Sequence, residues 1–220
     1  MRIGRGSKLL LIGDSITDCG RRQPVGEGPG DGLGNGYVGQ LNAVLTAFRP
    51  DLRIRVVNMG ISGNTVRSLR DRWRRDVLDL SPDWLSIMIG INDVWRHFDQ
   101  PLLRENHVGL DEYEGTLREL VAQTRPGLKG LVLMTPYYIE PQAGDPMRAM
   151  MDQYGAVVRE VAAEHDAVFV GTQSAFDAVT AHVYPGSLAG DRVHPNASGH
   201  MVITRAFLDA VGFEWRGAAG

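Results

Sequence analysis

A serine near the start of the chain and an Asp-x-x-His pair near its end have the residue types of a nucleophilic site. The serine is Ser15, and the pair is Asp191 and His194. A hydroxyl nucleophile needs a base that takes its proton and a carboxylate that orients the base. On a tight turn, a carboxylate three residues before a histidine can reach Nδ1 of its ring and fix the tautomer. These residues predict a catalytic triad of Ser15, His194 and Asp191.

Two further segments offer hydrogen-bond donors for the oxyanion that acyl transfer creates on the attacked carbonyl. Gly63, in the segment Asn58–Thr65, can present a backbone N–H without a side chain in the way. Asn92, in Gly90-Ile91-Asn92-Asp93, can present its side-chain amide. Glycine and asparagine are also ordinary turn residues after strands. Together with the N–H of Ser15, Gly63 and Asn92 are the predicted oxyanion hole.

Short apolar runs alternate with longer amphipathic segments along the chain. Five runs are typical of strands buried on both faces: Lys8–Gly13, Ile54–Met59, Trp84–Ile89, Gly130–Met134 and Ala167–Val170. Apolar residues recur at helical spacing within 38–48, 69–80, 113–121, 154–161 and 196–211. This alternation predicts a three-layer α/β/α sandwich with a five-stranded parallel sheet in flavodoxin-like order, forming a single domain over residues 1–220. Ser15, Gly63 and Asn92 then follow strands that end at one edge of the sheet.

Composition narrows the classes of function. The chain has 220 residues and a formal net charge of -3, which argues against nucleic acid or an anionic membrane as a partner. No run approaches the roughly 20 apolar residues of a membrane span. The one cysteine, Cys19, has no partner for an intramolecular disulfide, and we interpret it as a buried structural thiol. We therefore expect a soluble, cytoplasmic protein.

Two other features have weaker functional interpretations. The stretch Gly20–Gly36 holds seven glycines but no Gly-Lys-Ser/Thr, so we expect a long mobile loop that walls the site rather than a phosphate cradle. The remaining histidines show no paired metal-ligand spacing, so no metal site is predicted, and His200 is expected to face solvent or pack in the last helix. These histidines are His97, His107, His165, His182 and His200.

The candidate residues resemble the four sequence blocks of the SGNH (GDSL-type) hydrolases and occur in that family's order. The blocks are Gly13-Asp14-Ser15, Gly63, Gly90-x-Asn92-Asp93 and Asp191-x-x-His194-Pro195, and the resemblance covers about Lys8 to Val211. Ile16 departs from the family motif, which has leucine there. The stretches 13–18, 56–65 and 88–95 look closest to the family's bacterial intracellular acetylxylan esterases. A Gly-x-Ser-x-Gly elbow is absent because Thr17 replaces its second glycine, which argues against the α/β-hydrolase fold.

The resemblance implies a serine carboxylester hydrolase that removes O-acetyl groups from sugars, with acetylated xylo-oligosaccharides as substrates. It implies a covalent acetyl-enzyme, no cofactor and a homo-oligomeric assembly. Two alternatives stay open. The same triad can act on longer acyl esters or thioesters, as in lysophospholipases of the superfamily. The chain can also be a non-catalytic carbohydrate-binding protein on an inherited fold.

Aromatic and acidic residues near the predicted site are candidates for substrate binding. Trp95, three residues after Asn92, is expected to line the substrate pocket, whereas Trp73 and Trp84 are expected in the core. Asp14, beside the nucleophile, is assigned to the substrate-binding group and is expected to orient the loops by hydrogen bonding. The segments Tyr184-Pro185 and Phe213-Glu214-Trp215 are interpreted as contacts between subunits or as core.

Overall fold

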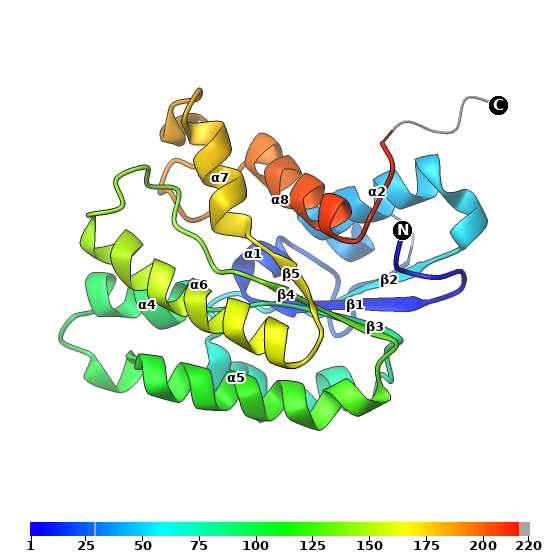
Figure 1. Cartoon of the computed structure of the whole chain (residues 1–220), viewed down its shortest axis with the longest axis horizontal. Helices are drawn as coiled ribbons and strands as arrows, with labels where there is room; N and C mark the ends of the chain where they lie inside the picture. The colour runs from blue at the N-terminus through cyan, green and yellow to red at the C-terminus, as the bar shows by residue number, and fades with distance from the viewer. Residues whose placement is uncertain (29, 216–220) are drawn as a thin grey trace.

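Five parallel strands form one sheet through the middle of the molecule (Figure 1). The structure is a computed structural model that describes residues 1–28 and 30–215. The strands are β1 (Lys8–Gly13), β2 (Arg55–Asn58), β3 (Trp84–Met88), β4 (Gly130–Met134) and β5 (Val168–Val170). Their order is β2-β1-β3-β4-β5, and every neighbouring pair is parallel. The flavodoxin-like order expected from the sequence is confirmed.

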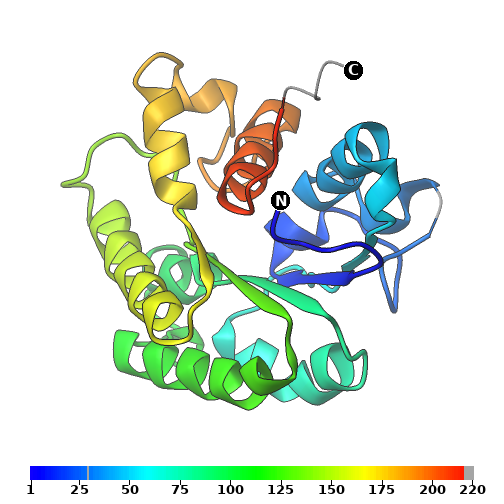
Figure 2. The same ribbon diagram turned by 45° about the vertical axis from the view of Figure 1, so that its right-hand side comes forward.

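Helices cover both faces of this sheet (Figures 1 and 2). One layer contains α2 (Tyr37–Phe48), α7 (Thr172–Thr180) and α8 (Ala197–Ala210), and α8 contacts each of the other two. The other contains α3 (Val66–Trp73), α4 (Ile91–Asp99), α5 (Leu110–Thr124) and α6 (Pro146–Glu164). A single helical turn, α1 (Ser15–Asp18), follows β1 directly. The result is the expected α/β/α sandwich.

The strands form where the sequence has continuous apolar runs because both faces of the sheet are covered. In β1, Leu9, Leu10, Leu11 and Ile12 are all fully buried, so consecutive side chains face opposite layers of helices. The boundaries of β1 and β4 match the predicted ones, and the other three strands are shorter than predicted by one or two residues. Trp73 and Trp84 are buried, as expected, and Nε1 of Trp73 donates a 2.8 Å hydrogen bond to Oγ1 of Thr124.

Two helices were not predicted from the sequence. In α4, the apolar residues Ile91, Val94, Trp95 and Phe98 do recur at helical spacing, but the helix has only nine residues, so this signal is short and was not recognised. In α7, the buried side chains are only Thr172, Gln173 and Phe176, too few for an apolar stripe. The predicted helix over 69–80 is instead α3 followed by a π-helical turn, Arg74–Leu78.

The strand register brings the segments after β1, β2 and β3 to one edge of the sheet. Gly13 of β1 pairs with Met88 of β3, and Leu11 of β1 pairs with Asn58 of β2. After β1 the chain enters α1, after β2 it enters the segment 59–65, and after β3 it enters α4. The carboxyl edge of a parallel sheet is where such folds bind ligands.

Candidate active site

Ser15 is the first residue of α1, immediately beyond the end of β1. Asp14 has extended backbone angles and caps this turn, since its Oδ1 accepts a 3.0 Å hydrogen bond from the N–H of Ile16. The Asp14 side chain is therefore directed back into the protein and is only 1% exposed. This corrects the assignment of Asp14 to substrate binding. Asp14 holds the nucleophile's helical turn and does not reach the surface of the site.

Ser15, His194 and Asp191 form a continuous chain of hydrogen bonds. Nδ1 of His194 lies 2.7 Å from Oδ2 of Asp191, and Nε2 lies 2.9 Å from Oγ of Ser15. The carboxylate accepts a hydrogen bond from Nδ1–H, so Nε2 carries no proton and is left to take the serine proton. The histidine and aspartate side chains are both almost half exposed, which leaves the triad open to a substrate. The geometry is that of a nucleophile, a general base and an orienting carboxylate.

The loop that holds Asp191 and His194 is tightly folded. Oδ1 of Asp191 accepts hydrogen bonds from the backbone N–H groups of Val193, at 2.9 Å, and His194, at 2.8 Å. Arg192 between them has a positive φ of 62°, which closes the turn. Burial opposes ionisation of Asp191, but the hydrogen bonds from His194 and Val193 hold the pKa of the carboxyl below its usual value. Asp191 is thereby kept in the anionic form that the histidine base requires.

Two backbone N–H groups at the site have no acceptor within the described residues. They belong to Ser15, at the start of α1, and to Gly63. Gly63 has a φ of 79°, a conformation that L side chains rarely adopt, and the space where a Cβ would lie is open. Free N–H groups beside a nucleophilic oxygen are what an oxyanion requires.

Both polar atoms of the Asn92 side-chain amide form hydrogen bonds within the protein. Its Nδ2 donates to the carbonyl of Asn64 at 3.0 Å, and its Oδ1 accepts from Nη2 of Arg96 at 2.9 Å. Because a guanidinium can only donate, the amide cannot be reversed, and the second hydrogen on Nδ2 is left for a ligand. Arg96 also forms an ion pair with Asp99. Sequence reasoning missed Arg96, and its position four residues after Asn92 was the available signal, because it places both on one helix face.

A buried arginine links the segment 59–65, which carries Gly63, to the end of β1. Arg72 of α3 donates to Oδ1 of Asn64 at 2.7 Å, to the carbonyl of Met59 at 2.8 Å and to the carbonyl of Gly13 at 3.0 Å. Its charge is balanced by Asp76, which is also buried. A single side chain thus links the end of β1 to the loop that carries Gly63. Sequence analysis did not identify this residue either.

Comparison with known proteins agrees with this geometry. Residues 11–202 match the model of the GDSL-like lipase/acylhydrolase family. The chain belongs to this family. It is 60% identical over 215 residues, 98% of each chain, to an acetylxylan esterase of Geobacillus stearothermophilus. The crystal structure of that organism's Axe2, an acetylxylan esterase, superposes with a TM-score of 0.98 at 59% identity and covers 99% of this chain and 100% of its own.

Other solved structures similar to this GDSL-like hydrolase extend the comparison. Three catalytic mutants of Axe2 replace a serine, a histidine or an aspartate with alanine. LAE5, an alpha/beta hydrolase enzyme from the metagenome of Lake Arreo, is 54% identical with a TM-score of 0.95, covering 96% of this chain and 98% of its own. The predicted resemblance to the family is confirmed over nearly the whole chain.

Two carboxyl groups are buried beneath the site of this family member. Asp14 and Asp93 have almost no exposed surface, and burial raises the pKa of each to about 7. Oδ1 of Asp93 accepts a 2.9 Å hydrogen bond from the N–H of Val66, which begins α3. Its Oδ2 has no hydrogen-bond partner within the described residues. Asp93 therefore joins α4 to α3.

The remaining predicted residues of this GDSL-like hydrolase have mixed outcomes. Trp95 lies beside the triad, with its ring centre 5.8 Å from that of His194. His200 is buried in the last helix, one of its two expected positions: its Nδ1 accepts a hydrogen bond from the N–H of Tyr37 at 3.1 Å, and burial lowers its pKa to about 4. The proton of the neutral ring is therefore on Nε2, 3.4 Å from Sγ of Cys19. The thiol is only partly buried, whereas a buried one was expected, and Cys19 is the residue that ends α1.

The glycine-rich stretch 20–36 packs beside the same edge of the sheet, except for residue 29, which lies outside the described residues. Nδ2 of Asn58 donates to the carbonyl of Leu33 at 2.8 Å and to that of Thr17 at 2.7 Å, joining this stretch to α1. Among residues 1–28 and 30–215, no cluster of His, Cys, Asp or Glu could hold a metal ion. No helix in the same ranges has the length and apolar character needed to cross a membrane.

Proposed function

We propose that the protein is a serine esterase that removes O-acetyl groups from acetylated xylo-oligosaccharides. The observation that carries this proposal is the unbroken chain of hydrogen bonds from Asp191 through His194 to Ser15, at 2.7 and 2.9 Å. The N–H groups of Ser15 and Gly63, which have no acceptor within the described residues, support it. The acetyl substrate is supported by the 60% identity to an acetylxylan esterase over 98% of both chains.

Acylation begins when His194 Nε2 takes the proton of the Ser15 hydroxyl and Oγ attacks the acetyl carbonyl. The carbonyl oxygen becomes an oxyanion, which accepts hydrogen bonds from the N–H groups of Ser15 and Gly63 and from Nδ2 of Asn92. Asp191 stabilises the imidazolium that forms. As the intermediate collapses, the imidazolium gives its proton to the departing sugar hydroxyl, and the acetyl group remains on Ser15.

Deacylation uses the same groups in reverse. His194 takes a proton from water, the resulting hydroxide attacks the acetyl-serine, and the same three donors hold the second oxyanion. Collapse releases acetate and returns the proton to Oγ of Ser15. Every proton is transferred by His194, so the reaction proceeds with the side chains and backbone groups of the site alone.

The test is acetate release from acetylated xylo-oligosaccharides by the purified protein, compared with 4-nitrophenyl acetate, butyrate and octanoate. We expect release of acetate and deacetylated sugar in equal amounts, and a kcat/KM that falls as the acyl chain lengthens. A rate that rises toward octanoate would instead support the long-chain acyl hydrolase. Binding of the sugar without turnover would support a carbohydrate-binding protein.

We also propose that the protein assembles as a homo-oligomer in the cytoplasm. Tyr184 is a large side chain that is 78% exposed, as expected for a contact between subunits, whereas Phe213 is buried and belongs to the core. The lone Cys19 suits a reducing compartment. Light scattering at several concentrations tests the assembly, and a monomer throughout would contradict it. Fractionation of expressing cells tests the compartment, where activity outside the cytoplasmic fraction would contradict it.

A further inference from the structure

A pocket of about 360 Å³ lies between α4 and the segment that leads from β4 into α6. Its lining includes the following side chains: Trp95, Phe98, Asp99, Tyr138, Asp145 and Met147. Its volume falls in the range of ligand pockets, about 300–1,000 Å³. We call it the aromatic pocket.

The aromatic pocket adjoins the triad through two ring contacts. The Trp95 ring lies edge-on to His194, with 5.8 Å between ring centres. On the opposite wall, the guanidinium carbon of Arg192 lies over the Tyr138 ring, 5.4 Å from the ring centre. Arg192 belongs to the loop that carries Asp191 and His194. The N–H of Ile139 also donates to the carbonyl of Arg192 at 2.9 Å. A substrate whose acetyl group is at Ser15 therefore has the aromatic pocket beside it.

The lining suits a pyranose ring. Sugars present flat C–H faces that pack on aromatic rings, and the pocket has three such rings, including Phe98, which is 41% exposed. Sugars also have a rim of hydroxyl donors. One carboxylate oxygen of Asp99 accepts a hydrogen bond from Arg96, and one of Asp145 accepts hydrogen bonds from the first backbone N–H groups of α6. Their other oxygens have no hydrogen-bond partner among residues 1–28 and 30–215, and so can accept from hydroxyls.

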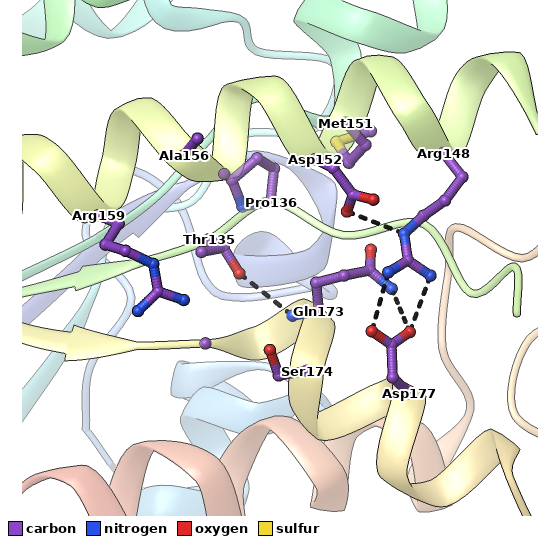
Figure 3. A pocket seen from close by; sticks show the side chains of 12 residues that line it. Thr135, Pro136, Arg148, Met151, Asp152, Ala156, Arg159, Gln173, Ser174 and Asp177 are labelled. Carbon is purple, nitrogen blue, oxygen red and sulfur yellow. Dashed lines mark hydrogen bonds and ion pairs between the residues drawn. The ribbon is translucent and has the colours of Figure 1, made fainter. Parts of the chain in front are cut away.

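One wall of the pocket is held rigidly from behind. Gln173 of α7 clamps the backbone of Tyr138, accepting its N–H at 2.8 Å and donating to its carbonyl at 3.1 Å. Figure 3 shows how this glutamine is fixed: it donates to Asp177, which forms a two-pronged ion pair with the buried Arg148 of α6. A wall positioned in advance loses little conformational freedom when a ligand binds.

We propose that the aromatic pocket is a sugar subsite, which holds the xylopyranose unit next to the acetylated unit at Ser15. The inference rests on the proposed deacetylation and adds the requirement for a neighbouring sugar. It predicts that an acetylated oligosaccharide is a better substrate than an acetylated monosaccharide, because only the oligosaccharide reaches Phe98 and Tyr138.

The test compares Phe98→Ala with the unmodified protein on acetylated xylotriose, acetylated xylose and 4-nitrophenyl acetate. Within residues 1–28 and 30–215, Phe98 makes no hydrogen bond or ring contact with the triad, and the change removes one face of the subsite. We expect kcat/KM on acetylated xylotriose to fall about tenfold through KM, the effect of losing one aromatic contact. The fall on 4-nitrophenyl acetate should be several-fold smaller. Phe48→Ala, which removes an exposed phenylalanine at the end of α2, is the matched control and should change none of the three.

Each other outcome has a distinct meaning. An equal fall on all three substrates, or no fall on xylotriose, would overturn the subsite while leaving the esterase intact. A fall confined to an octanoate ester would overturn it in favour of an acyl channel. Hydrolysis of 4-nitrophenyl acetate with no release of acetate from any acetylated sugar would contradict the proposed function itself.

Discussion

Replacing Arg96 with methionine tests whether the oxyanion amide depends on a residue that has no contact with the triad. In the structure, Nη2 of Arg96 is the one donor to Oδ1 of Asn92 within the described residues. Methionine keeps the length of the side chain and its helix propensity but removes this donor. The Asn92 amide then keeps only its bond to Asn64, so Nδ2 is less well directed toward the oxyanion.

The size of the effect follows from the bond that is lost. A hydrogen bond to a charged group contributes about 1.5–3 kcal/mol, and each 1.36 kcal/mol is a factor of ten in rate. The Arg96 side chain is 20% exposed, so water replaces part of the interaction. We therefore expect kcat to fall about 10- to 100-fold with little change in KM. Complete loss of the donor in Asn92→Ala sets the upper bound, about 10²- to 10³-fold.

A double-mutant cycle with 4-nitrophenyl acetate separates this role from others. If Arg96 acts through the amide, the combined variant of Arg96→Met and Asn92→Ala should be no slower than Asn92→Ala alone. Arg104→Met, which replaces an exposed arginine just beyond α4, is the control and should keep full activity. Effects that multiply in the double variant, or a change in KM alone, would show that Arg96 does not act through the Asn92 amide.

Two further predictions concern stability. Burial raises the pKa of Asp93 to about 7, above its ordinary value of 3.8, so the folded state binds this proton more tightly than the unfolded state does. The stability that the proton contributes is complete below about pH 4 and is lost as the pH rises through 7. The urea midpoint should therefore fall less between pH 4 and pH 8 in Asp93→Asn than in the unmodified protein; equal falls would contradict this. A Cβ on Gly60 would lie 2.2 Å from the backbone nitrogen of Asp18, so Gly60→Ala should lose at least about 2 kcal/mol of unfolding free energy. Gly115→Ala, in an open helical position, should lose none, and equal stability of the two variants would count against the packing argument.

Much of the framework was predictable because burial on both faces leaves a simple signal. The run from Leu9 to Ile12 is continuous and apolar, and it forms the strand that it predicts. Once strands alternate with helices, their ends meet at one edge, and the positions of Ser15, Gly63 and Asn92 follow. The Asp-x-x-His spacing likewise predicts a local contact, because three residues of turn can bring Asp191 to Nδ1 of His194.

The parts that sequence did not predict depend on where long or polar side chains point. Arg96 and Arg72 reach their partners through flexible side chains, and Arg72 bonds Gly13 from 59 positions away. Asp14 forms a hydrogen bond, as expected, but the N-cap geometry turns its carboxylate inward and away from a substrate. For His200 the sequence left two positions open, and only the contact with Tyr37 shows that it packs in the core. Such contacts arise from tertiary packing and produce no periodic pattern in the sequence.

The most direct test of Ser15 as the nucleophile is the rate of acetate release by Ser15→Ala on an acetylated xylo-oligosaccharide. We expect a loss of at least about 10⁴-fold in kcat, with the fold and the affinity for the sugar retained. Incubation of the unmodified protein with substrate, followed by rapid acid quench and mass analysis, should place an acetyl group on Ser15. Activity of Ser15→Ala within tenfold of the unmodified protein would contradict the assignment of this residue as the nucleophile.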